Sequence, residues 1–163
     1  MNNPLLIRDA TAEDAPFILE LIKELATFEK DPDAVIINEA YLIKEGFSKT
    51  PSFKVFIAEL NTKVVGMALF YPRFSTWKGK TLHLEDLIVK QDKRNLGIGK
   101  ALYTHFLHYA AQQKVKRVEW VVLDWNTNAI NFYKKSGANV LTDWQIVQMN
   151  EQQINQFVKK NTI

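Results

Sequence analysis

One stretch of the sequence, past the middle of the chain, has the residue types that bind an anion. It reads Arg94-Asn95-Leu96-Gly97-Ile98-Gly99-Lys100 and lies between an expected strand and an expected helix. The first backbone N–H groups of a helix have no partner within the helix, and glycines let a diphosphate come close to them. Arg94 and Lys100 could add positive charge there. A bend with glycines can equally be only a tight turn. A dinucleotide site of the Rossmann type needs three glycines after the first strand, whereas this turn has two and lies past the middle of the chain, so a dinucleotide site is disfavoured.

Titratable side chains on the strand before this turn could handle a proton. Glu85 lies on the strand expected at residues 81–89, where its carboxylate could accept a proton from an amine through water, or simply attract an ammonium group. A solvated or ion-paired strand acid is the alternative interpretation. Asp86 points to the opposite face if the strand is regular, so we expect only Glu85 to face the cleft. His83 shares the parity of Glu85 and could lie on its face, although an isolated histidine is more often structural.

The composition excludes several classes of chemistry. The chain has no cysteine, so disulfides, thiol catalysis and thiolate metal sites are absent, and its 3 histidines have no recognised ligand spacing. No Gly-x-Ser-x-Gly motif indicates a nucleophilic serine. The 21 basic and 18 acidic residues are spread along the chain, which does not favour nucleic acid as a partner. No apolar run reaches the roughly 20 residues of a membrane span, so we expect a cytoplasmic protein without a membrane partner. The missing cysteines and the histidine spacing predict that it holds no metal.

The spacing of apolar residues predicts a chain of mixed strands and helices. Strands are expected at residues 5–8, 53–59, 64–71, 81–89, 118–123 and 144–149, and helices at 11–28, 38–45, 98–113, 128–135 and 150–159. The segments on either side of Asn61-Thr62-Lys63 indicate an antiparallel hairpin. The order strand, glycine turn, helix, strand over residues 81–123 indicates a βαβ unit with parallel strands and a right-handed crossover. No linker or repeat interrupts the pattern, so we predict one α/β (α+β) domain over residues 1–163.

The glycine turn also resembles a family motif. Residues 94–99 match the pattern Q/R-x-x-G-x-G/A of the acetyl-CoA pyrophosphate turn in the GNAT superfamily of N-acetyltransferases. Nearly the whole chain is similar to the diamine (spermidine/spermine) and thialysine acetyltransferase branch, through residues 22–26, 28–29, 75–80, 84–86, 122–126 and 131–138. The stretches at 75–79 and 123–126 look more like the thialysine members. The resemblance implies a GNAT fold, with a mixed central sheet, an antiparallel N-terminal part, a βαβ acetyl-CoA unit and helices on both faces.

The resemblance implies how acetyl-CoA would be held as a co-substrate. Backbone groups of Leu87, Ile88 and Val89 would meet its acetyl and pantetheine parts. The pyrophosphate would lie against Arg94, Asn95, Leu96, Gly97, Ile98, Gly99 and Lys100, and the pantetheine arm beside Asn126, Thr127, Asn128 and Ala129. Tyr133 would lie next to the thioester. The family usually has glycine where this chain has Asn95, and asparagine tolerates left-handed backbone angles better than most residues.

Acetyl transfer would give particular side chains a role. The reaction needs a neutral amine, stabilisation of the developing oxyanion and a proton for the departing thiolate. With neither a cysteine nor a serine elbow in the chain, we expect direct attack in a ternary complex. We predict Tyr133 as the general acid, unless it only packs, Glu85 as the group that accepts the amine proton, and a main-chain N–H near Val89 as the oxyanion donor.

By the same resemblance the substrate amine would lie near Phe28, Glu29, Trp77, Glu85 and Trp120. Polyamine enzymes carry an acid two positions before this first tryptophan, where the chain has Ser75. We therefore expect a small amine such as lysine, thialysine or a diamine, and favour one that carries its own carboxylate. A GNAT enzyme for protein or antibiotic amines, and a non-catalytic acetyl-CoA-binding protein, stay open as alternatives. The likeness also implies a homodimer in which the C-terminal strand or helix packs on a partner.

Overall fold

The computed structural model describes residues 5–161 and divides after Val121 into two compact units. The first contains, in order, β1 (Leu6–Asp9), the 3₁₀ turn η1 (Ala12–Asp14), α1 (Ala15–Phe28), η2 (Pro32–Ala34), α2 (Glu39–Gly46), β2 (Lys54–Leu60), β3 (Lys63–Ser75), β4 (Gly79–Val89), η3 (Gln91–Lys93), α3 (Ile98–Gln112) and β5 (Arg117–Glu119). The second contains α4 (Thr127–Lys135) and α5 (Glu151–Lys160). Every helix within residues 5–161 is too short or too polar to span a lipid bilayer.

The strands of the first unit form one mixed sheet in the order β1-β2-β3-β4-β5. Antiparallel pairing joins β1 to β2, β2 to β3 and β3 to β4, whereas β5 runs parallel to β4. The hairpin between β2 and β3 turns at Asn61 and Thr62, whose φ angles of 51° and 63° are those a tight hairpin turn requires. The predicted hairpin, the parallel βαβ unit and the mixed sheet of the GNAT fold are thereby confirmed.

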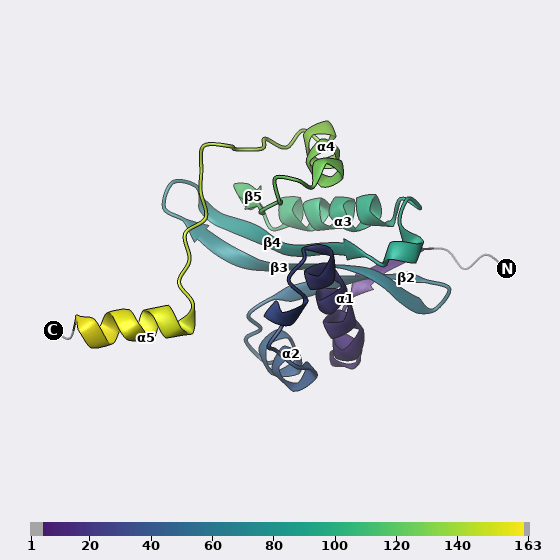
Figure 1. Ribbon diagram of the computed structural model, residues 1–163. Coiled ribbons are helices and arrows are strands. Elements are labelled where there is room, and N and C mark those ends of the chain that lie inside the picture. Colours follow the sequence, from purple (N-terminus) through teal and green to yellow (C-terminus); the bar gives the residue numbers. More distant parts are fainter. Residues whose placement is uncertain (1–4, 162–163) are drawn as a thin grey trace. The chain divides into compact units, whose positions relative to one another are not determined.

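Helices cover both faces of this sheet, with α1 and α2 on one face and α3 on the other (Figure 1). Alternate strand positions supply the two cores because successive side chains of a strand point to opposite faces. Ile57 and Met67 pack with Ile18 and Leu21 of α1. Phe70 lies on the α3 side, with its ring 5.0 Å from that of Phe106. The apolar stripe predicted for α3 is thus confirmed as its packing face.

The pairing of β3 with β4 is interrupted by a bulge. Phe70 pairs with Leu84 and Leu69 with Asp86, so Glu85 is an extra residue that has no register partner on β3. A bulge of this kind bends the strand and changes the direction of the side chains around it, and bulges are frequent beside active sites. The regular alternation on which the sequence analysis placed Asp86 opposite Glu85 therefore does not hold at this point of β4.

Two expected strands are corrected by the structure. The strand expected at residues 118–123 is limited to Arg117–Glu119, because its ladder with β4 ends at the pair of His83 and Glu119. The strand expected at 144–149 is absent, and residues 144–149 are irregular and exposed. Within residues 5–161 no strand pairs with that segment, and apolar alternation alone cannot replace the ladder hydrogen bonds of a strand. Helix α5 follows as predicted, with reciprocal capping between Asn150 and Gln153.

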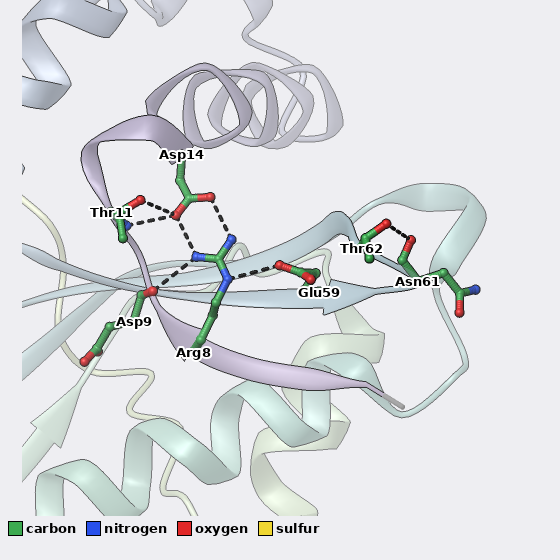
Figure 2. A network of polar contacts seen from close by, with 7 residues as sticks. All are labelled: Arg8, Asp9, Thr11, Asp14, Glu59, Asn61 and Thr62. Carbon is green, nitrogen blue, oxygen red and sulfur yellow. Dashed lines mark hydrogen bonds and ion pairs between the residues drawn. The ribbon is translucent and has the colours of Figure 1, made fainter. Parts of the chain in front are cut away.

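A charged network fixes the N-terminal strand to the start of α1 (Figure 2). The Arg8 guanidinium donates to both carboxylate oxygens of Asp14, at 2.7 and 2.9 Å, and to Glu59 at 3.1 Å. Asp14 also accepts the backbone N–H of Thr11 at 2.8 Å, which is one half of the capping box predicted there. The Arg8 guanidinium holds the pKa of Asp14 below its usual value, despite burial that acts in the other direction. The network therefore links β1, β2 and α1 most strongly while Asp14 is ionised.

Candidate active site

The turn between β4 and α3 has the backbone form of an anion-binding loop. Asn95 and Gly97 both have positive φ, 65° and 78°. The predicted tolerance of Asn95 for a left-handed conformation is therefore confirmed. Gly97 is the N-cap of α3 and has no side chain with which to cap the first N–H groups of the helix. A Cβ atom on Gly97 would meet nothing within 4 Å, so the backbone angle rather than lack of space favours glycine there.

Arg94 connects this turn with the end of α1. Its Nε donates to the carbonyl oxygen of Val89 at 3.2 Å. Its guanidinium carbon lies 5.1 Å from the centre of the Phe28 ring, which is within the range of a cation–π contact. The structure thus brings together Arg94, which is predicted to bind acetyl-CoA, and Phe28, which is predicted to lie near the substrate amine. Lys100 is exposed on the first turn of α3, so its charge is free to face a ligand.

One edge of β4 loses its strand partner just before the bulge. The ladder with β5 covers only Thr81, Leu82 and His83, so within residues 5–161 the following stretch of β4 has a strand partner on its β3 side alone. Main-chain directions alternate along a strand, so only some of the N–H and C=O groups of Leu87, Ile88 and Val89 face this other edge. Of these, the Val89 carbonyl already accepts from Arg94, and the others are available for hydrogen bonds. An extended chain containing amides, such as a pantetheine arm, fits an edge of this kind.

Glu85 lies in a polar group that also contains Tyr71 and His83. The Tyr71 hydroxyl donates to the Glu85 carboxylate at 2.8 Å, and His83 Nε2 lies 3.6 Å from the same oxygen. The rings of Tyr71 and His83 stack with centroids 5.2 Å apart. Burial and the neighbouring Glu85 carboxylate raise the pKa of Tyr71 to about 12, so its hydroxyl stays a donor at neutral pH. The expectation that His83 lies on the side of Glu85 is confirmed.

Asp86 is a titratable group that the sequence analysis placed opposite Glu85 and to which it gave no role. Burial, followed by the charges of Glu85 and Glu29, raises the pKa of Asp86 from 3.8 to about 7. Desolvation also raises the pKa of Glu29, at the C-terminal end of α1. Glu85 on β4 and Glu29, the C-cap of α1, thus both act on Asp86. We call these three acids the acidic cluster. A carboxyl group poised near neutral pH is suited to accept a proton.

Trp77 and Trp120, the two tryptophans predicted to lie near the substrate amine, come from different parts of the sheet. Trp77 lies at the turn between β3 and β4 and is 80% exposed. The stretch of β4 from Gly79 to Glu85 spans roughly 20 Å at the rise of an extended strand, so the chain does not bring its own Trp77 beside its own Glu85. Trp120 follows β5 and makes an edge-to-face contact with Tyr103, with ring centroids 5.7 Å apart.

The second unit carries the remaining predicted donor residues. Asn126 is the N-cap of α4, and its side chain accepts the backbone N–H of Ala129 at 3.2 Å. Thr127 and Asn128 form the exposed first turn of the helix. Tyr133 lies further along α4, with its ring 5.4 Å from that of Phe132. The placement of these residues within α4 agrees with the helix predicted from the sequence.

We call residues 94–100 the donor turn, because they are predicted to bind the acetyl donor, acetyl-CoA. The mixed sheet and this turn are those of an acetyltransferase, and comparison with known proteins agrees. The sequence profile of the Acetyltransferase (GNAT) family matches residues 15–138. The chain belongs to this family, and it is an acetyl-CoA-dependent N-acetyltransferase.

Individual relatives narrow the comparison. The thialysine N-epsilon-acetyltransferase of Bos taurus is 38% identical over 147 residues, which are 85% of this chain and 86% of that protein. The spermidine/spermine N(1)-acetyltransferase-like protein 1 of Homo sapiens is 35% identical over 158 residues, which are 91% of this chain but 23% of that protein. Among solved structures, an integron cassette protein from the mobile metagenome of V. cholerae has a TM-score of 0.78 at 24% identity, covering 95% of this chain and 98% of that one. This structural likeness supports the fold.

Proposed function

We propose that the protein transfers the acetyl group of acetyl-CoA directly to a primary amine of a small molecule, of the thialysine, lysine or diamine type, within a ternary complex. The observation that carries the proposal is the acidic cluster, in which Glu85 and Asp86 lie on β4, the strand that leads into the glycine turn, and Glu29 is the C-cap of α1. Acids attract an ammonium group, and the turn attracts a diphosphate. The names of the thialysine acetyltransferase relatives support the same substrate class.

Acetyl-CoA would supply an acetyl thioester to this site. On the proposal, the uncapped start of α3, together with Arg94 and Lys100, binds the pyrophosphate. The open edge at Leu87, Ile88 and Val89 orients the pantetheine arm, and a main-chain N–H of that edge donates to the acetyl oxygen. The family resemblance adds Asn126 to Ala129, at the start of α4, as residues that contact the arm.

The amine must lose a proton before it can attack. A lysine-type ammonium has a pKa of about 10.4, so the neutral form costs about 4.6 kcal/mol at pH 7. Glu85 and Glu29 hold the ammonium electrostatically, and Asp86, whose pKa is raised to about 7, is matched to take its proton. In this mechanism the proton-accepting role that the sequence analysis gave to Glu85 is shared between two adjacent carboxyl groups.

Tyr133 is proposed as the group that returns a proton to the departing sulfur. A phenol is an acid of suitable strength for a thiolate, and the tyrosine belongs to the same helix whose start is proposed to flank the pantetheine arm. Direct attack of the amine on the thioester needs no covalent intermediate on the enzyme, and the chain has neither a cysteine nor a Gly-x-Ser-x-Gly motif to form one. Tyr133 then acts only after the amine has attacked. As the C–S bond breaks, the nitrogen loses its second proton to form the amide, which balances the proton that Tyr133 gives to the sulfur and allows Tyr133 to be reprotonated.

A substrate panel tests the proposed function. Lysine, thialysine, ornithine, spermidine and short diamines are compared at fixed acetyl-CoA by the release of free CoA thiol. We expect the highest kcat/KM for the short amines that carry a carboxylate, since Ser75 replaces the acid expected of polyamine enzymes. Preference for spermidine by ten-fold or more would overturn this ranking. Binding of acetyl-CoA without turnover of any amine would identify a non-catalytic binding protein, and turnover only of peptides or aminoglycosides would identify the other alternative.

We further propose that the protein is a cytoplasmic homodimer. The C-terminal arm, residues 139–161, exposes many apolar side chains: Leu141, Trp144, Ile146, Val147, Met149, Ile154, Phe157 and Val158. Exposed apolar surface of this extent commonly marks an interface. The lack of cysteine is compatible with a reducing compartment. Gel filtration with light scattering tests the dimer, and a monomer at micromolar concentration would contradict it.

A further inference from the structure

One face of α1 lies along the segment that leads from β4 into the donor turn. Three α1 side chains spaced four residues apart contact successive positions of this segment, so the helix and the segment run side by side. The contacts join Glu20 to Lys90 (2.7 Å), Glu24 to the backbone N–H of Gln91 (2.8 Å) and Phe28 to Arg94 (5.1 Å). We call this set of contacts the α1 seam.

The contact of Glu24 differs in kind from the other two. Glu20 and Lys90 form an exposed ion pair, and such pairs contribute little. Phe28 and Arg94 meet through a long side chain that can move away. Glu24, which is half-buried, instead accepts a hydrogen bond from a main-chain group at the start of η3. A charged acceptor on a backbone N–H gives a short, strong bond and fixes the path of the chain itself.

The seam connects the two halves of the site. Phe28 ends α1 and Glu29 is its C-cap, and both are proposed to lie on the amine side; residues 91–94 continue directly into the glycine turn, which is proposed to bind acetyl-CoA. The hydrogen bond of Glu24 to the Gln91 N–H thus ties the path of the chain before the turn to α1. If a ligand at the turn restricts residues 91–94, the restriction reaches the end of α1 through this bond. A second ligand that needs the end of α1 in place then loses less conformational entropy on binding.

We propose that Glu24 is a positioning residue that couples the two substrates, so that CoA bound at the turn tightens the binding of the amine. The inference rests on the proposed function and deepens it, since it concerns how the same site is regulated. Coupling of this type is reciprocal, so the amine must tighten CoA by the same factor. The expected order is that acetyl-CoA binds before the amine.

Calorimetry measures the coupling without chemistry, because CoA lacks the acetyl group. The dissociation constant of lysine or thialysine is measured with and without saturating CoA. We expect CoA to tighten the amine about five-fold or more in the unmodified protein, in the range of ordinary coupling energies. Glu24→Ala should reduce this factor to near one, and Glu24→Gln, which keeps an oxygen acceptor, should retain part of it. Glu39→Ala removes an exposed helix acid of α2 as a matched control and should leave the factor unchanged.

Kinetics give a second measurement that loss of folding would not reproduce. In Glu24→Ala the KM of the amine should rise several-fold at saturating acetyl-CoA, with kcat reduced less than two-fold and the melting temperature checked in parallel. A Glu24→Ala coupling factor equal to that of the unmodified protein overturns the inference, and so does the absence of coupling in the unmodified protein. If the unmodified protein binds no CoA or acetylates no amine, the proposed function itself fails. The two failures are thereby distinguished.

Discussion

Replacing Asp86 with asparagine should change activity and stability in opposite directions. Burial and the charges of Glu85 and Glu29 raise the pKa of Asp86 to about 7 in the folded protein. The same carboxyl group in the unfolded chain has a pKa of about 3.9. A group whose pKa is raised on folding stabilises the protein fully below the unfolded value, and this stability is lost as the pH rises through the folded value. Asp86 therefore reduces stability progressively between about pH 4 and pH 7.

The size of the effect follows from the difference between these two pKa values. One pKa unit corresponds to about 1.4 kcal/mol, so ionised Asp86 reduces the free energy of unfolding by up to about 4 kcal/mol at pH 8. Asparagine carries no charge at any pH. Asp86→Asn should therefore be more stable than the unmodified protein at pH 8, and the advantage should disappear near pH 4. Urea unfolding at both pH values measures this difference.

Activity should respond in the other direction. A positioned general base contributes about 10²- to 10⁴-fold to the rate, so Asp86→Asn should lose activity by that factor. In the unmodified protein kcat/KM for the amine should rise with pH through about 7, as Asp86 becomes able to accept a proton. Glu85→Gln removes a charge that raises the pKa of Asp86, and it should move this rise to lower pH. Asp33→Asn, at an exposed acid in η2, serves as the control and should leave both the profile and the stability unchanged.

Two results would refute this reasoning. An Asp86→Asn variant with full turnover would remove Asp86 from proton transfer, and one destabilised equally at pH 4 and pH 8 would remove the electrostatic argument. If Glu85→Gln abolishes the pH-dependent rise instead of shifting it, Glu85 is the base, as the alternation of the strand predicted.

Three further predictions concern other parts of the molecule. Tyr133→Phe should lower kcat about ten-fold or more with little change in the affinity for acetyl-CoA, and equal rates in a stopped-flow or thiol-release assay would exclude Tyr133 as the acid. Gly97→Ala should lower the free energy of unfolding by about 1 kcal/mol or more because φ is +78° there. Gly99→Ala, whose Cβ would meet only an ordinary contact at 3.7 Å, should weaken acetyl-CoA binding without a comparable decrease in the melting temperature. Asp14→Asn should cost about 2 kcal/mol at pH 7 by removing charge-assisted bonds from Arg8. Because the pKa of Asp14 is lowered on folding, this stabilisation is complete above the unfolded pKa of about 3.9 and decreases as the pH falls toward the folded value, so urea titrations should show a smaller deficit at pH 3 than at pH 7.

Local signals were sufficient for much of the fold. The hairpin at Asn61 and Thr62, the apolar stripe of α3 and the left-handed conformation at Asn95 each depend on residues next to one another in the chain. For such features the backbone preferences of the residues decide the structure. The expected strand at 144–149 failed for the converse reason: a strand also needs a partner, and its own residue pattern says nothing about whether one exists.

The candidate site was predictable in its residue types but not in its geometry. Glu85 was selected over Asp86 by assuming regular alternation, and the bulge that breaks the alternation arises from the pairing of β4 with β3. The α1 seam was not recognised either, because Glu20 and Glu24 meet partners that are 70 and 67 positions away in the chain. On their own, two acids four residues apart on a helix are expected to be solvated.

Both edges of β4 lose regular pairing at nearly the same level, and this accounts for the position of the proposed reaction. On one edge, Glu85 is an extra residue opposite β3, and on the other edge the ladder to β5 ends at His83. The first irregularity brings adjacent carboxyl groups into one cluster, and the second frees the main chain of the residues that follow. Two of the three acceptor acids, Glu85 and Asp86, and the edge proposed for acetyl-CoA are therefore consecutive parts of one strand. A covalent chain held in a sheet fixes the separation between amine and thioester more rigidly than loops could, which leaves the end of α1 as the part of the site whose position needs the additional constraint of Glu24.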